Sequence, residues 1–318
     1  MSPAFRCCGM KLVLITGARG FIGRHVARCL AKLNYKAIGT GHGAWSGAPD
    51  WGLDDWLVGE VDAANLDILA ERHGAPEFVV HLAGGATVGA SIRSPLEDFQ
   101  RTALTTVRLL EWIRLSAPAA QVMAASSAAV YGSGHPGPIA ETASLNPYSP
   151  YGTHKLILEE LFRSYSTNFG LQTLLLRLFS VFGEGLEKQV LWDLCTKLRD
   201  SEGAELGGSG DEQRDWVHVE DVARLFELSM THADSSCPVF NGASGKPHSM
   251  RELVSTVKSE WGDGLNVRFS GQKRSGDPYC LTADTSLVQR VMGFQPEIDP
   301  VVGFRRYVNW FRTHFLSP

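Results

Sequence analysis

The sequence predicts a doubly wound α/β fold, in which helices cover both faces of a parallel sheet, together with a smaller C-terminal α/β lobe. Short apolar runs typical of buried strands occupy residues 11–15, 36–40, 56–62, 78–82 and 120–125. Runs with helical periodicity alternate with them, which is the pattern of a parallel sheet. The first strand also runs directly into a glycine-rich turn and then into a helix.

The composition is that of an ordinary globular protein. The 318 residues are 44% hydrophobic and 20% charged, and a chain of this length can bury one large core or two medium ones. The net charge is −4 and no run of Lys and Arg exceeds two residues, which argues against nucleic acid or an anionic membrane as a partner. An anionic ligand would therefore need local arginines.

Targeting and redox signals point to the cytoplasm. No apolar window approaches eighteen residues, and residues 1–9 lack the apolar segment of a signal peptide, so we expect a disordered tail there. The cysteines show neither a CxxC motif nor metal-ligand spacing: Cys7, Cys8, Cys29, Cys195, Cys237 and Cys280. We therefore expect reduced thiols and no metal site.

The turn after the first strand predicts a dinucleotide site of the Rossmann type. Gly17, Gly20 and Gly23 form a GxxGxxG turn between strand and helix. Glycines allow close backbone approach to a pyrophosphate, and the helix N-terminus offers free N–H groups and a positive dipole end. The residues expected to bind the cofactor are Gly17, Arg19, Gly20, Phe21, Ile22, Gly23, Thr40, Val61, Asp62, Leu82, Ala83, Gly84, Tyr151 and Lys155.

The end of the second strand bears on the choice of cofactor. An NAD site normally has an acidic residue there to hold the ribose 2′-hydroxyl, whereas this chain has Gly41. Without that carboxylate a 2′-phosphate meets no repulsion, and Arg19 could pair with it. We therefore expect NADP(H) to be favoured, with NAD(H) as the alternative. Asp62, at the end of the third strand, is a candidate acceptor for the adenine amino group.

A proton-transfer pair is predicted on the helix that begins near Pro150. Tyr151 and Lys155 are four residues apart and therefore share one face of that helix. A phenol, with a pKa of about 10, works as an acid or base at neutral pH only if its pKa is lowered, which a neighbouring ammonium can do. Alone, the pair would also fit a solvated helix face. Ser126 and Ser127 add hydroxyls at a strand end, where ligands sit in such sheets.

Four motifs occur in the order and spacing of one family: TGxxGFIG at 16–23, HLAG at 81–84, SSAAVYG at 126–132 and SPYGxxK at 149–155. By them the chain, from Met10 onward, resembles the extended short-chain dehydrogenase/reductases that act on nucleotide sugars, a branch that includes UDP-galactose 4-epimerase. The resemblance implies that Tyr151 is the catalytic acid/base. It also implies that Lys155 lowers the pKa of Tyr151 and holds the nicotinamide ribose, and that Ser127 is the partner hydroxyl.

The second half of the chain resembles the substrate part of the same family. Residues 177–183 resemble its crossing into the substrate domain, 208–222 its diphosphate-contacting segment and 273–277 its RPGD motif. Arg214 and Arg274 are then two guanidinium groups that could close on a diphosphate. The substrate contacts expected on this basis are Ser126, Ser180, Lys188, Gln189, Arg214, Arg274 and Asp277.

The expected boundaries follow from these assignments. The dinucleotide-binding domain should span residues 10–178 and be rejoined by about 216–242. The substrate lobe should comprise 179–215 and 243–318, with a nucleoside-diphosphate sugar in the cleft between the two. Family analogy also implies a homodimer.

Departures from the family pattern narrow the reaction. Ala128 and Ala129 stand where sugar-nucleotide dehydratases carry an acidic pair and decarboxylases a glutamate, so those reactions lack their acid/base groups. Two reactions remain, reduction of a 4-keto sugar by NADPH and 4-epimerisation. Gly41 and Arg19 favour the reductase, which we expect, whereas the SSAAVYG motif favours the epimerase. A non-catalytic NADP-binding regulator is a remote third alternative, because the catalytic trio is intact.

Overall fold

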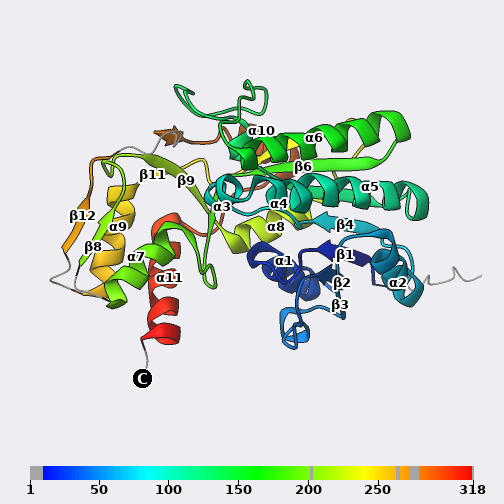
Figure 1. Cartoon of the computed structure of the whole chain (residues 1–318), viewed down its shortest axis with the longest axis horizontal. Coiled ribbons are helices and arrows are strands. Elements are labelled where there is room, and N and C mark those ends of the chain that lie inside the picture. The colour runs from blue at the N-terminus through cyan, green and yellow to red at the C-terminus, as the bar shows by residue number, and fades with distance from the viewer. Residues whose placement is uncertain (1–9, 201–202, 263–265, 273–278, 317–318) are drawn as a thin grey trace, which may run out of the picture.

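The computed structural model describes residues 10–200, 203–262, 266–272 and 279–316. The chain forms a larger lobe around a seven-stranded sheet and a smaller lobe beside it, in which α7, α9 and α11 lie close together (Figure 1). Residues 1–9, Arg274 and Asp277, for which the sequence carried expectations, lie outside the described residues. Among the described residues, none of the helices is long and apolar enough to cross a membrane.

The sheet of the larger lobe is parallel throughout, in the order β10-β6-β5-β4-β1-β2-β3. Its strands are β1 (Leu12–Thr16), β2 (Lys36–Gly41), β3 (Asp55–Val58), β4 (Phe78–His81), β5 (Gln121–Ser127), β6 (Gln172–Leu178) and β10 (Val239–Gly242). The strand order reverses between β1 and β4, and ligands of doubly wound sheets bind outside the carboxyl ends of strands at such a point. The predicted fold class is confirmed.

Helices cover both faces of this sheet because successive strand residues point to opposite sides. Val13 and Ile15 belong to one apolar core with α1 (Phe21–Lys32), α8 (Val219–Ser229) and α10 (Ser286–Met292). Leu12 and Leu14 belong to the other core, with α2 (Ala63–His73), α5 (Thr105–Ser116) and α6 (Pro150–Phe169). The sheet is therefore buried on both sides.

The connection from β4 to β5 is divided into more helical segments than the apolar periodicity of its sequence suggests. It comprises α3 (Val88–Arg93), α4 (Pro95–Phe99), the π-helical segment η2 (Gln100–Leu104) and α5. Within η2 the Thr102 hydroxyl accepts a hydrogen bond from the Gly85 N–H at 2.8 Å, and the Thr102 carbonyl accepts one from Thr106 Oγ1 at 2.6 Å. Short π segments are frequent at functional sites, and this one is tied to the turn after β4.

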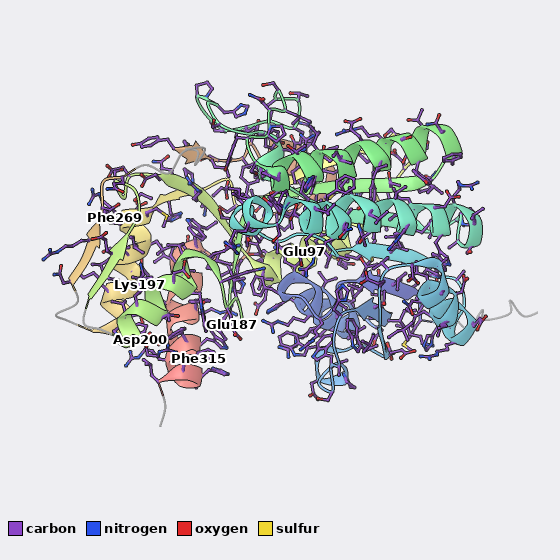
Figure 2. The ribbon with its side chains drawn as sticks, viewed as in Figure 1. Glu97, Glu187, Lys197, Asp200, Phe269 and Phe315 are labelled. Atoms are coloured by element: carbon purple, nitrogen blue, oxygen red, sulfur yellow. The ribbon has the colours of Figure 1, made fainter. Side chains whose placement is uncertain are left out.

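The smaller lobe has its own apolar core. Its main sheet contains β7 (Ser180–Phe182), β9 (Gln213–His218), β11 (Pro247–Ser249) and β13 (Cys280–Leu281), and a separate pair joins β8 (Gly203–Leu206) to β12 (Asn266–Phe269). The helices are α7 (Gln189–Asp200), α9 (Met250–Trp261) and α11 (Pro300–Phe315). Phe269 and Phe315, which pack against this core, lie in the smaller lobe, and Glu97 lies in the larger one (Figure 2).

The chain passes between the lobes several times. After β6 it enters the smaller lobe at β7, and α8 and β10 then return to the larger lobe. The helix α10 also belongs to the larger lobe, because Val288 and Met292 are buried in its core. Residues 243–318 are therefore not all part of the smaller lobe, which differs from the expected boundary.

Candidate active site

A cavity of about 1180 Å³ opens along the carboxyl ends of β1, β4 and β5 and extends to residues of the smaller lobe. This volume lies above the range of about 300–1,000 Å³ that is usual for pockets holding one small ligand. The cavity therefore has room for a dinucleotide and a second ligand.

The glycine turn after β1 forms one wall of the cavity. Gly17 has a φ of 72°, and a Cβ atom there would lie 2.8 Å from the Ala83 amide nitrogen, so only glycine lets this turn pack against the turn after β4. Gly20 is the N-cap of α1 and has no side chain to bond the N–H groups of the first turn. Those groups are suited to an anion such as a pyrophosphate. The cofactor residues expected in this wall all line the cavity: Gly17, Arg19, Gly20, Phe21, Ile22, Gly23, Leu82, Ala83 and Gly84.

The start of α6 positions the catalytic candidates. Ser149 is its N-cap and accepts a hydrogen bond from the Gly152 N–H at 3.2 Å, and Pro150 occupies the first helical position. Tyr151 therefore stands in the first turn and Lys155 one turn later, and both line the cavity with Ser127.

Both proton-transfer side chains are anchored to the end of β5. Lys155 Nζ donates to the Ala125 carbonyl at 2.8 Å, and Tyr151 is hydrogen-bonded to the Ser127 side chain. Burial raises the pKa of Tyr151 above its usual value, and the bond to Ser127 opposes this rise. Burial lowers the pKa of Lys155 to about 8. Ser127 therefore lowers the pKa of Tyr151, and the lowering expected from Lys155 stays a prediction.

A buried network supports the catalytic strand. Ser126 Oγ donates to Glu159 at 2.6 Å, and Arg177 binds both carboxylate oxygens of Glu159 at 2.9 and 2.7 Å. Arg177 also donates to the Tyr131 hydroxyl, which donates to Asn241 on β10 at 2.7 Å. Ser126 lines the cavity, but its hydroxyl is bonded to Glu159, which differs from the substrate contact expected for it.

Packing at the rim of the cavity next to β2 explains why residue 41 is a glycine. A Cβ atom on this residue would lie 2.9 Å from the ring of Trp56, so the Trp56 side chain occupies the space of any larger residue. Glu60 reaches the same rim, where its carboxylate lies 3.8 Å from His42 Nε2, and Arg19 donates to the His42 carbonyl at 3.2 Å. The missing acid after β2 is thus explained by packing, and a carboxylate is present nearby.

Two of the residues expected to bind the cofactor, Thr40 and Asp62, are not among those that line the cavity. Thr40 is fully buried and is not among the residues that line the cavity, because its strand is covered on both faces. Asp62 is the N-cap of α2 and accepts a hydrogen bond from the Asn65 N–H at 3.0 Å. Val61, the residue before it, does line the cavity.

The smaller lobe contributes the far wall of the cavity. Ser180, Lys188, Gln189 and Arg214 line it, as expected for substrate contacts. Burial lowers the pKa of Lys188, and Arg214 Nη1 donates to the Gln213 carbonyl at 2.9 Å. Cationic groups from β9 and from the residue before α7 therefore line the same cavity as the glycine turn.

Comparison with known proteins decides the family. The profile of the NAD dependent epimerase/dehydratase family matches residues 13–241. The chain belongs to this family. The predicted membership of the nucleotide-sugar branch of the extended short-chain dehydrogenase/reductases, and the prediction of an NAD(P)-dependent enzyme, are both confirmed.

Full-length relatives share this architecture. A UDP-glucose 4-epimerase of Halalkalibacterium halodurans is 27% identical over 329 residues, which cover 95% of this chain and 96% of that protein. The structure of MoeE5 in complex with UDP-glucuronic acid and NAD has a TM-score of 0.84 at 30% identity, covering 95% of this chain and 99% of that one. The UDP-glucose 4-epimerase of Thermotoga maritima with UDP-glucose has a TM-score of 0.87 at 26% identity, again covering 95% and 99%.

Several cavity residues of this epimerase/dehydratase family member were missed by sequence reasoning: Trp56, Glu60, Thr87, Arg101, Arg108 and Tyr148. Trp56 and Glu60 carried a signal, because they flank the end of the third strand, where only Val61 and Asp62 were chosen. Arg101 and Arg108 stand on η2 and α5, and nothing in the periodicity of those segments distinguishes them from solvent-facing residues.

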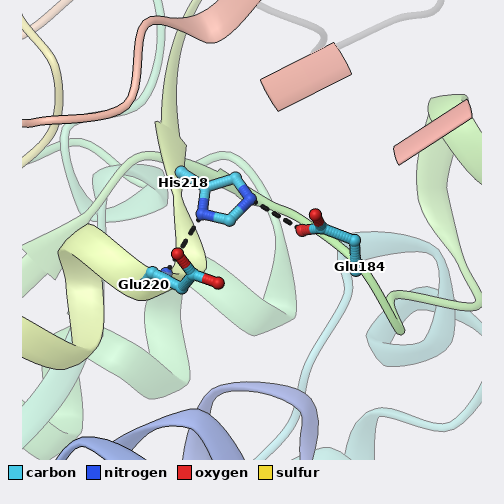
Figure 3. Close-up of side chains that lie close together, drawn as sticks. All are labelled: Glu184, His218 and Glu220. Carbon is cyan, nitrogen blue, oxygen red and sulfur yellow. Dashed lines mark hydrogen bonds and ion pairs between the residues drawn. The ribbon is translucent and has the colours of Figure 1, made fainter. Parts of the chain in front are cut away.

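A cluster with metal-ligand chemistry lies outside the cavity, where α8 meets the smaller lobe. Figure 3 shows His218 between Glu184 and Glu220. His218 Nε2 bonds Glu184 at 2.9 Å, and His218 Nδ1 accepts from the Glu220 N–H at 3.3 Å. Arg306 on α11 binds both carboxylates, at 2.7 and 2.8 Å. The Arg306 guanidinium offsets one of the two negative charges and links α11 to the residues around the start of α8.

Proposed function

We propose that this enzyme is a nucleoside-diphosphate-sugar 4-epimerase that uses NAD(H). The observation that carries the proposal is the arrangement of Ser127, Tyr151 and Lys155 on one wall of a cavity that joins the glycine turn to the smaller lobe. Proton and hydride exchange at one sugar carbon needs an acid/base group and a dinucleotide side by side, and this arrangement supplies places for both.

The residues have separable roles in such a reaction. Tyr151 would accept the proton of the sugar hydroxyl on oxidation and return it on reduction, and Ser127 would hold the same oxygen. Lys155 Nζ has three donors, one of which goes to Ala125, so two remain for ribose hydroxyls. The glycine turn and the N-terminus of α1 would hold the pyrophosphate. Bound nicotinamide supplies the hydride acceptor and donor.

Three observations favour the epimerase. Relatives that match along nearly their whole length carry the name UDP-glucose 4-epimerase. Ala128 and Ala129 offer no acid/base group for elimination of water. The Glu60 carboxylate at the rim beside β2 would repel a 2′-phosphate, which supports NAD over NADP.

A second candidate keeps a specific observation in its favour. Arg19 lines the cavity at the same rim and could pair with a 2′-phosphate, as an NADPH-dependent 4-ketoreductase would need. This is the reaction expected from the sequence. It uses the same Tyr151 and Ser127 but consumes one NADPH for each turnover.

The experiment that separates the two starts with protein purified without added cofactor. Mass analysis of any released dinucleotide is followed by assays with UDP-glucose and UDP-galactose and with a nucleotide 4-keto sugar plus NADPH. Co-purified NAD and interconversion of the two sugars without net redox would support the epimerase. Empty protein that consumes NADPH with the keto sugar would replace it by the reductase.

We also propose that the nucleotide diphosphate binds at Arg214 and Lys188, with Arg274 as the second guanidinium expected from the sequence. Both described residues line the cavity that also holds the glycine turn. Arg214→Ala should raise KM for the nucleotide sugar more than it lowers kcat, because a diphosphate contact far from C4 contributes to binding in ground and transition states alike.

A homodimer through α5 and α6 and the segment before them is the last part of the proposal. Large apolar side chains are exposed there: Ile92, Leu96, Phe99, Leu115 and Phe169. A dimer interface over these neighbouring helices would cover apolar side chains that a monomer leaves in water. Light scattering would test it, since a monomer at micromolar concentration would contradict it.

A further inference from the structure

A buried pair of hydrogen-bonded side chains, Asp98 and His154, lies behind the catalytic helix. His154, the residue before Lys155, places Nδ1 2.6 Å from the Asp98 carboxylate on α4. Asp98 is 5% exposed and His154 9%, so the pair is shielded from water. The ring of Phe99 packs edge-on against His154, with 5.4 Å between the ring centres. The reaction as described above makes no use of this pair.

The Asp98 carboxylate and the Lys155 ammonium face the same two-residue turn. A Cβ atom at Gly85 would overlap Asp98 Oδ1, and one at Gly84 would lie 3.5 Å from Lys155 Nζ. Thr102 Oγ1 lies 3.5 Å from the Gly84 position and 3.2 Å from the Gly85 position. The two charges therefore lie around the same short turn, without direct contact with each other.

The Lys155 ammonium needs a negative charge nearby to remain protonated in a buried site. Lys155 is buried, and burial favours the neutral amine over the ammonium. A carboxylate nearby in a poorly solvated region restores the preference for the ammonium, since the attraction between charges is screened far less there than in water. Asp98 has this effect on Lys155, and it also opposes ionisation of Tyr151.

Resting on the function proposed above, we propose that Asp98, held in place by His154, is a positioning residue that keeps Lys155 charged and so sets the pH range in which the Ser127–Tyr151–Lys155 trio works. His154 fixes the carboxylate by a hydrogen bond from α6 itself. The charge therefore moves with the helix that carries the two catalytic side chains.

Other charged groups near α6 are mostly balanced by partners of their own. On β4, burial lowers the pKa of His81 to about 3, which leaves its ring neutral between Thr16 and Thr106. The remaining groups on the packed elements are the pairs Glu97–Arg101, Glu111–Arg114 and Glu159–Arg177, exposed Arg93 on α3 and exposed Arg108 on α5. Glu159 also favours the ammonium of Lys155, but Arg177 and Arg163 both bind its carboxylate.

The test is a direct titration of Lys155 in the full chain. Lysines labelled with ¹³C at Cε are followed by NMR against pH, and the Lys155 signal is assigned with Lys155→Met. In Asp98→Asn the Lys155 midpoint should fall by about one pH unit, the lower end of what a close opposite charge contributes. In His154→Gln it should stay near that of the parent protein, because the carboxylate remains and the amide can still donate to it.

Controls separate charge from folding. Glu160→Gln removes an exposed carboxylate from the same helix and should leave the Lys155 midpoint unchanged. If Asp98→Asn folds poorly, the double variant D98N/H154Q replaces the pair by two amides and carries the same expectation. An unchanged Lys155 midpoint in the folded Asp98 variants would overturn the proposal.

Activity provides a second readout. The alkaline limb of the kcat/KM profile of Asp98→Asn should move to lower pH by the same amount as the NMR midpoint. A moved NMR midpoint in a protein that turns over no nucleotide sugar would contradict the proposed function and leave the role of Asp98 intact. A moved midpoint with an unmoved alkaline limb would show that Lys155 does not set the working pH range, and would overturn that part of the inference.

Discussion

Lys155 Nζ lies 6.0 Å from the centre of the Tyr151 ring, one turn further along α6. The spacing of four residues places both side chains on one face of the helix, and the end of β5 then fixes each of them, Lys155 through Ala125 and Tyr151 through Ser127. The proton-transfer geometry is thus set by two elements that are rigidly paired, which is what positioning of reacting groups requires.

Replacing Lys155 should change how stability depends on pH. The pKa of Lys155 in the folded protein, about 8, lies below its unfolded value of about 10.4, so the folded state carries the full cost of the buried ammonium below about pH 8 and loses it as the pH rises to about 10.4. The free energy of unfolding of Lys155→Met, measured relative to the parent protein, should therefore be higher at about pH 7 than at about pH 10. The difference should approach about 3 kcal/mol.

Urea unfolding of both proteins at the two pH values measures that difference. Lys32→Met, which removes an exposed lysine at the end of α1, is the comparison. A gap between Lys155→Met and the parent that is constant with pH would contradict the depressed pKa of Lys155.

The rim beside β2 should control the choice of cofactor. Glu60→Gln removes the carboxylate there and should improve binding of NADP(H) relative to NAD(H) by about two- to fivefold, the size expected for an exposed charge. Arg19→Ala should change the ratio in the opposite direction by a similar factor. Fluorescence titration with both dinucleotides, at low and high salt, checks both shifts, which should shrink as salt is added. Equal ratios in all three proteins would remove these residues from cofactor selection.

The network under β5 should be sensitive to loss of its cation. Arg177→Met leaves the buried Glu159 carboxylate with the Ser126 hydroxyl and one partly exposed cation, Arg163, and should cost about 3–5 kcal/mol of unfolding free energy. Arg163→Met, at the exposed side of the same carboxylate, should cost about 1 kcal/mol or less. Denaturant unfolding measures both free energies, and equal losses in the two variants would contradict the assigned role of Arg177.

Removal of metal ions should not disturb the cluster of Glu184, His218 and Glu220. Dialysis against a chelator should not lower Tm, because the Arg306 guanidinium already binds both Glu184 and Glu220. Arg306→Met should lower Tm, and added zinc should restore part of the loss, since three ligand atoms within 4.8 Å of one another are then left without their counter-charge. A chelator effect on the parent protein would show that a metal is bound there.

Sequence reasoning reached the parts of the site that depend on local pattern. The glycine turn needs a strand before it and a helix after it, and the relation of Tyr151 to Lys155 needs only the helical repeat, so both could be predicted from neighbouring residues. The same holds for the strands at 11–15 and 78–82, whose apolar runs show their burial directly.

The parts that were missed depend on contacts between distant segments. Gly41 is explained by Trp56, which packs beside it from β3, and the pair of Asp98 and His154 joins residues 56 positions apart. Asp62 illustrates a different cause, because an acidic residue at a strand end is also the ordinary start of a helix, and α2 uses it in that way. Neither spacing nor composition separates these outcomes.

The measurement that tests the central claim most directly is proton NMR of UDP-glucose incubated with the enzyme and a catalytic amount of NAD, compared between the parent protein and Tyr151→Phe. The account predicts that the parent converts the sugar to UDP-galactose without accumulating NADH. It also predicts that Tyr151→Phe is slower by about 10²–10⁴ while still binding NAD, and that Tyr165→Phe, on the same helix outside the cavity, matches the parent. Equal rates in the parent and Tyr151→Phe would contradict it.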